Sequence, residues 1–73
     1  MRKILTEAAE AMLAELRDVA ASLELHAELL DRWANESTKY GWSTHQVDAQ
    51  KNTADAFRRQ AAHVRGVIRK VTE

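Results

Sequence analysis

The stretch Tyr40-Gly41-Trp42-Ser43-Thr44-His45-Gln46-Val47 predicts the end of one helix and the start of the next. Glycine has no Cβ, so Gly41 can adopt the left-handed conformation that ends many helices. Ser43, followed three residues later by Gln46, matches a capping box, in which each side chain bonds a free backbone N–H of the other residue. The sequence therefore predicts a tight turn between two helices.

The composition on both sides of this turn favours helix. The 73 residues include no proline, and Gly41 and Gly66 are the only glycines. Aromatic and β-branched residues are too scattered for a sheet. The absence of cysteine excludes disulfides and cysteine zinc sites. Acidic residues near the N-terminus, and the lack of a long apolar run, lead us to expect a cytoplasmic protein that does not enter a membrane.

Apolar side chains recur at alternating intervals of four and three residues, which is the heptad pattern of packed helices. In the first segment the pattern runs through Leu5, Ala9, Met12, Leu16, Val19, Leu23, His26, Leu30, Trp33 and Tyr40. In the second it runs through Val47, Gln50, Ala54, Phe57, Ala61, Val64, Ile68 and Val71. We expect one all-α domain spanning 1–73, a two-helix antiparallel hairpin with helices at about 3–40 and 44–72 and a turn at 41–43.

A turn this short also predicts which residues lie at the same level on the two helices. Folding about Trp42 pairs residues whose numbers add up to about 84. This register places His26 beside Phe57. It also places Trp33 beside Gln50, whose amide oxygen can accept a hydrogen bond from the indole N–H.

Charge is unevenly distributed along the chain, although the formal net charge is zero. Residues 1–43 carry five basic and eight acidic side chains, a net −3, and residues 44–73 carry six basic and three acidic ones, a net +3. The simplest interpretation is that the two helices neutralise each other. On one flank, basic side chains of the second helix can lie over alanines of the first and reach Glu24 or Asp31. These basic residues are Lys51, Arg58 and Arg65.

The opposite flank is small and weakly apolar on both helices, and its leucines have no predicted partner within the hairpin. A chain of this size buries too little apolar surface in a lone pair of helices. We therefore expect a homodimer that forms an antiparallel four-helix bundle. Its predicted interface consists of Leu25, Leu29, Ala56 and Val67. The alternative is a monomeric hairpin on which these side chains are exposed.

No catalytic or metal-binding pattern appears in the sequence. There is no glycine-rich phosphate loop and no set of Ser, His and acidic residues that converges on one place. His26, His45 and His63 have spacings that match no metal motif. We expect a protein that is not an enzyme and that uses no cofactor or metal.

What remains are two classes of binding function. The first is a small regulatory protein that associates with itself and with an unidentified protein, of the kind that phages and mobile elements encode as accessory or inhibitor proteins. The alternative is a nucleic-acid-binding regulator that uses the basic face of the second helix. The candidate contacts with a partner or nucleic acid are Arg59, Arg65, Arg69, Lys70, Tyr40 and Trp42.

In outline, the architecture resembles the small dimeric hairpin that regulates plasmid copy number by binding RNA, and the WXG-type secreted hairpins. The turn here reads Tyr40-Gly41-Trp42, whereas the WXG turn carries Trp-x-Gly, and the C-terminal Tyr-x-x-x-acid export signal is missing. Neither resemblance assigns a role to a residue of this chain.

Overall fold

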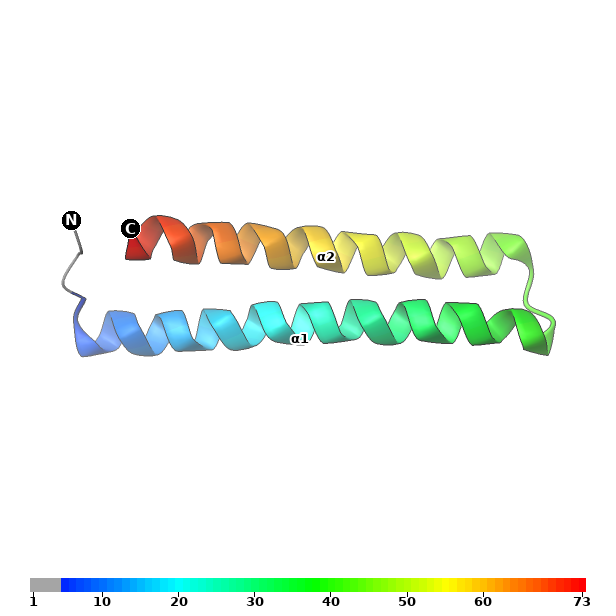
Figure 1. Cartoon of the computed structure of the whole chain (residues 1–73), viewed down its shortest axis with the longest axis horizontal. Helices are drawn as coiled ribbons and strands as arrows, with labels where there is room; N and C mark the ends of the chain where they lie inside the picture. Colours follow the sequence, from blue (N-terminus) through cyan, green and yellow to red (C-terminus); the bar gives the residue numbers. More distant parts are fainter. Residues whose placement is uncertain (1–4) are drawn as a thin grey trace.

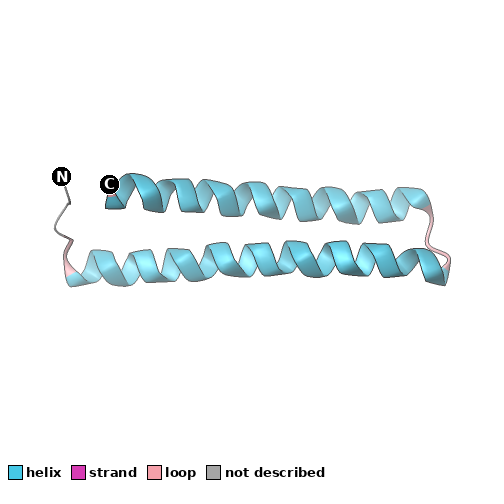
Figure 2. Cartoon of the chain, viewed as in Figure 1, coloured by secondary structure: helices cyan, strands magenta, loops and turns pink. Residues whose placement is uncertain are grey.

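The computed structural model describes residues 5–73, which form two long helices lying side by side and running in opposite directions (Figure 1). Helix α1 spans Glu7–Ser37 and continues into a short 3-10 helix, η1, at Thr38–Tyr40. Helix α2 spans Thr44–Thr72, and within residues 5–73 only positions 5–6, 41–43 and 73 lie outside helices (Figure 2). The rod measures 54 × 16 × 13 Å. The predicted antiparallel hairpin is confirmed.

Helix α1 begins where a threonine caps it. Thr6 has an extended backbone, and its hydroxyl accepts a hydrogen bond from the Ala9 N–H at 3.2 Å. This bond satisfies one of the N–H groups left free in the first turn. The predicted helix start near residue 3 lies outside the described residues, and within them the helix starts at Glu7.

The turn has the chemistry that the sequence predicts. Gly41 takes the left-handed conformation, with φ of 85°. The Gln46 N–H donates to the Ser43 hydroxyl at 3.2 Å, and the Ser43 N–H donates to the Gln46 side-chain oxygen at 2.9 Å. Both bonds of the capping box are therefore present. At the turn, the backbone N–H of Trp42 also donates a hydrogen bond to the Ser37 carbonyl.

The core of the hairpin is one row of mainly small residues on each helix. On α1 the row consists of Leu13, Ala20, Ala27 and Ala34. On α2 it consists of Val47, Ala54, Ala61 and Ile68. Both rows repeat every seven residues, so they stay in contact along the whole rod. The α2 row belongs to the predicted seam and is confirmed as core. Of the other predicted seam positions on α2, Gln50, Phe57 and Val64 are half-buried and Val71 is exposed.

The sequence predicts a different row on α1, and that prediction is wrong for five positions. Met12, Val19, His26, Trp33 and Tyr40 are exposed. For Met12 the exposed fraction is 64%, and for Trp33 it is 55%. The leucines of the other predicted α1 row stay half-buried, so the helix is rotated by roughly 50°, half the angle between successive residues. The reason is size, because facing alanine rows let the backbones approach and gain dispersion contacts along their length.

Aromatic contacts confirm one predicted pair and correct another. The rings of His26 and Phe57 lie with centroids 5.9 Å apart, as the register predicts. Trp33 lies against Trp42, with centroids 5.7 Å apart, instead of bonding Gln50. The side-chain oxygen of Gln50 is buried and has no hydrogen-bond partner among residues 5–73. The rotation of α1 explains the change, because it moves Trp33 outward.

A pair of alanine variants tests this seam. We expect Ala27→Leu to lower the free energy of unfolding by about 1–3 kcal/mol, because the larger side chain forces two closely packed helices apart. The control is Ala21→Leu, at an exposed position in the middle of the same helix, which should change stability by less than about 0.5 kcal/mol. Thermal unfolding followed by circular dichroism measures both. Equal effects would contradict the alanine seam.

The two glycines provide a second matched pair. Apart from the adjacent residues and the local helix backbone, no described atom lies within 4 Å of a Cβ added at either position, so space limits neither substitution. Gly41→Ala should destabilise the hairpin by about 1–2 kcal/mol, because alanine resists the left-handed conformation. Gly66→Ala, within α2, should stabilise it by up to about 1 kcal/mol through helix propensity. Melting temperatures that shift in the same direction would show that the turn does not require a left-handed residue.

Candidate interaction surface

One side of the rod carries ion pairs that join the two helices. Arg58 pairs with Asp31 on the other helix and with Asp55 on its own, the latter at 3.0 Å. Arg65 makes two hydrogen bonds to the Glu24 carboxylate. These contacts confirm the prediction that arginines reach over the alanines to the acidic residues of α1. We call this side the charged face.

The ion pairs change the proton affinity of their members. Hydrogen bonds from Arg65 hold the pKa of Glu24 below its ordinary value of 4.5. The hydrogen bond to Asp31 raises the pKa of Arg58, and the bond to Glu24 raises that of Arg65. Glu24, Arg58 and Arg65 therefore stay ionised at neutral pH. They remain partly exposed, so each pair contributes modestly to stability.

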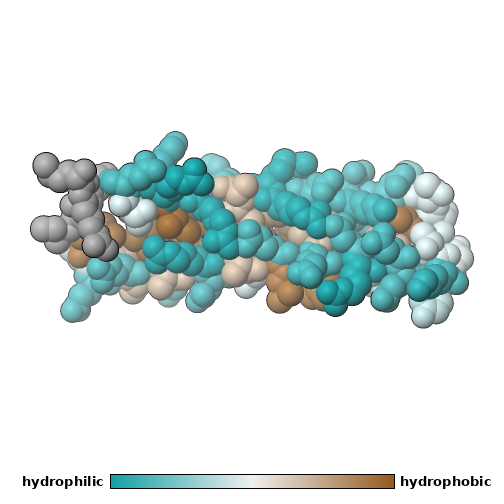
Figure 3. Space-filling view, in the orientation of Figure 1, coloured by the Kyte–Doolittle hydropathy of each residue, from teal (hydrophilic) through white to brown (hydrophobic). Residues whose placement is uncertain are grey.

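The view in Figure 3 shows a predominantly hydrophilic surface in which apolar atoms appear in limited patches. The flank opposite the charged face has a different composition, because the rotation of α1 moves a row of large side chains onto it. We call it the apolar face. Its members are Met12, Leu16, Val19, Leu23, His26, Leu30 and Trp33 of α1 and Phe57, Val64, Val67 and Val71 of α2. These residues are half-buried or exposed, and none is fully buried.

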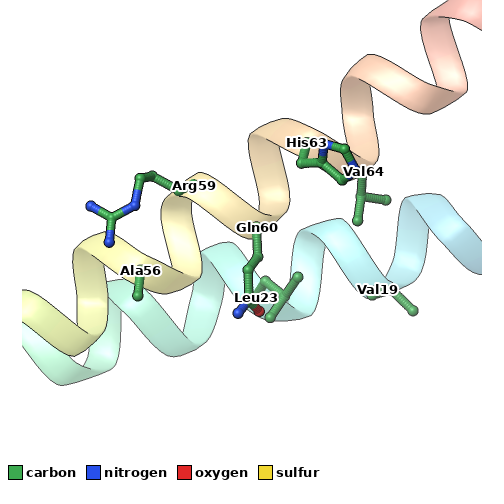
Figure 4. A pocket seen from close by; sticks show the side chains of 7 residues that line it. All are labelled: Val19, Leu23, Ala56, Arg59, Gln60, His63 and Val64. Atoms are coloured by element: carbon green, nitrogen blue, oxygen red, sulfur yellow. The ribbon is translucent and has the colours of Figure 1, made fainter.

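A groove of about 620 Å³ lies in the middle of the apolar face (Figure 4). It is lined by Val19 and Leu23 of α1 and by Ala56, Arg59, Gln60, His63 and Val64 of α2. In Figure 4 the Gln60 side chain points toward α1, whereas the Arg59 side chain extends away from it. The groove can therefore receive an apolar side chain from another helix and offers Gln60 and His63 as polar neighbours.

The four residues of the predicted dimer interface occupy different places. Val67 is on the apolar face, and Ala56 lines its groove. Leu29 stands three residues after His26, at the outer edge of that face. Leu25 is 56% exposed and, two residues before the buried Ala27, points away from α2. The structure thus brings three of these residues to the side of the apolar face and places Leu25 on the side of α1 that points away from α2.

The predicted basic residues of α2 do not act as one free cluster. Arg65 is engaged by Glu24 on the charged face, whereas Arg59 lies at the rim of the groove. Arg69 and Lys70 are exposed in the last turn of α2, where their charge interacts favourably with the negative end of the helix dipole. Among these four residues, Arg65 is thus held in an ion pair within the hairpin, whereas Arg59, Arg69 and Lys70 are exposed.

The turn end of the rod gathers the aromatic candidates. Tyr40 is 82% exposed, and Trp42 is exposed beside Trp33. Exposed aromatic side chains at one end of a rod are common anchors for a partner. The sequence places Tyr40 and Trp42 together through the turn, but the Trp33–Trp42 contact is found only in the structure.

Within residues 5–73, no group of three or more His, Cys, Asp or Glu side chains is placed to hold a metal ion. In the same part of the chain, neither helix has a stretch long and apolar enough to cross a membrane.

The lowered pKa of Glu24 predicts how its ion pair responds to acid. A carboxyl group whose pKa is lower in the folded state contributes stability that is fully present above 4.5 and is lost as pH falls through the folded pKa. We therefore expect Glu24→Gln to lower the melting temperature at pH 7 and to match the unaltered chain near pH 2. The control is Asp18→Asn, at an exposed position inside α1, which should change the melting temperature at pH 7 much less. A melting-temperature difference between Glu24→Gln and the unaltered chain that persists at pH 2 would contradict an electrostatic role.

The chain was also compared with known proteins. No protein-family model, curated protein or solved structure matches it. Its function is therefore inferred from its own surfaces.

Proposed function

We propose that this chain is a non-enzymatic interaction protein, a helical hairpin that associates with itself through the apolar face and binds another macromolecule in that form. The observation that carries this proposal is the exposure of Met12, Val19 and Trp33 in one row beside Val67 and Val71. Soluble monomers rarely leave such a continuous apolar strip in water. A second hairpin is the simplest cover for it.

The dimensions of the rod agree with a dimer. A face 54 Å long and 16 Å wide has an area of roughly 850 Å², close to the 800 Å² or so that each partner buries in a specific interface. Burying apolar surface stabilises by about 25 cal/mol per Å². Two copies packed by their apolar faces form a four-helix bundle, in which the half-buried leucines of both copies become core.

The pairing of Arg65 with Glu24 supports protein binding over the alternative of nucleic-acid binding. A phosphate that took this arginine would have to displace a carboxylate bound by two hydrogen bonds. The near-neutral pI of about 6.8 adds no general attraction for nucleic acid. The regulatory function proposed here therefore acts through protein contacts, and the turn end with Tyr40 and Trp42 is the surface that stays available for them in a dimer.

A double substitution on the apolar face tests self-association. Val19→Asp with Val67→Asp should convert the dimer into a monomer, because two carboxylates per copy would be desolvated in the interface. Leu25→Asp is the matched control, since Leu25 points away from α2. This variant should keep the dimeric mass. Sedimentation equilibrium gives the masses. A chain that is already monomeric at high micromolar concentration would rule out the proposal, and a monomer produced by Leu25→Asp alone would move the interface behind α1.

A further inference from the structure

We propose that the two hairpins pack with their turns at the same end of the bundle, so that α1 of each copy lies on α2 of the other. This inference rests on the proposed self-association. The alternative arrangement has the turns at opposite ends, with α1 on α1 and α2 on α2. Both arrangements cover the apolar face, so the side chains along its edges and centre distinguish them.

The two outer edges of the apolar face differ in charge. Seven-residue spacing places one row along the α1 edge, consisting of Glu15, Ser22, Leu29 and Glu36. The corresponding row along the α2 edge consists of Ala49, Ala56, His63 and Lys70. Arg59 lies next to the α2 row at the rim of the groove. The α1 edge is thus acidic and the α2 edge basic, which favours contact between unlike edges.

The register within the hairpin fixes the levels at which these edges meet. The His26–Phe57 contact shows that residues of equal height have numbers adding up to about 84. A two-fold axis along the rod preserves height, so each α1 residue meets the α2 residue of the partner at its own level. Glu15 then faces the partner's Lys70, an acid against a base. Leu29 faces the partner's Ala56, a large side chain against a small one.

The central rows match in the same way. Val19 lies at the level of the partner's Val67, which gives an apolar contact beside the groove. His26 lies at the level of the partner's Gln60. In the edge rows, Ser22 lies at the level of the partner's His63, so polar groups meet polar groups in both places. A buried polar group needs such a partner, because burial without a hydrogen bond costs roughly 1–3 kcal/mol.

The opposite-end arrangement produces mismatches along the same rows. With the axis near the middle of the rod, Val19 meets the partner's His26, and Glu15 meets the partner's Leu29. The two basic α2 edges also lie side by side, so the acidic α1 edge no longer meets a basic edge. Like charges across an interface oppose association. The same-end arrangement avoids these contacts and gathers the aromatic turn ends of both copies.

Distances between spin labels test the arrangement directly, and the absence of cysteine makes each label unique. Lys39→Cys places a label at the exposed turn end, and Ala21→Cys places one at an exposed mid-rod position of α1. In the same-end dimer both positions should give inter-copy distances below about 35 Å by double electron–electron resonance, on the scale of a bundle two helices wide. In the opposite-end dimer the Lys39→Cys distance should approach the 54 Å length of the rod, while the Ala21→Cys distance stays short.

The two labels distinguish a wrong packing arrangement from the absence of self-association. A short Ala21→Cys distance with a long Lys39→Cys distance would overturn the same-end arrangement and leave the dimer intact. No dipolar coupling at either position would overturn self-association and the arrangement with it. A charge exchange gives an independent reading. Glu15→Lys should weaken the dimer several-fold, and adding Lys70→Glu should restore it. Failure of the second change to restore affinity would also contradict the same-end packing.

Discussion

The close contact of two alanine rows is the constraint on which the rest of the structure depends. Ala20, Ala27 and Ala34 are completely buried against the row that contains Ala54 and Ala61. Where methyl groups separate two helices, the backbones approach and larger side chains cannot enter the seam. These side chains are displaced to the two flanks. One flank becomes a charged face of arginine–carboxylate pairs, and the other becomes the apolar face.

The turn determines how the displaced side chains are paired. Gly41 ends the 3-10 helix η1 that follows α1, and the Ser43–Gln46 capping box starts α2 two residues later, so the levels of all residues along the rod follow from this turn. Arg58 and Arg65 are seven residues apart and meet Asp31 and Glu24, which are also seven apart. The pairs cover the alanines on that side. Within residues 5–73, no comparable contact covers the leucines and valines on the other side.

Features that depend on local chemistry can be predicted from this sequence. The stop at Gly41, the cap at Ser43 and the α2 seam all follow from residue types within one or two turns, and the cross-helix ion pairs follow from the resulting register. The rotation of α1 cannot be predicted in this way. Three neighbouring rows of α1 are apolar, and a hydrophobic pattern does not rank them. The row with the smallest side chains packs against α2. The recurrence of Ala20, Ala27 and Ala34 every seven residues was the signal in the sequence that identifies this row. The displaced row containing Val19 and the groove beside it were missed for the same reason.

A seam of alanines also bears on how the protein acts. Stability gained per residue scales with the apolar area buried, and alanine has little to bury. In the proposed dimer, the second copy would cover the larger apolar side chains that the hairpin leaves half-exposed, and folding would then depend on protein concentration. In the proposed dimer the apolar face of each copy is buried in the interface with the other copy. A further macromolecule must bind elsewhere, and the same-end packing would double the exposed Tyr40 and Trp42 at a single site. Alignment of the two copies would then create the binding surface that neither copy has alone.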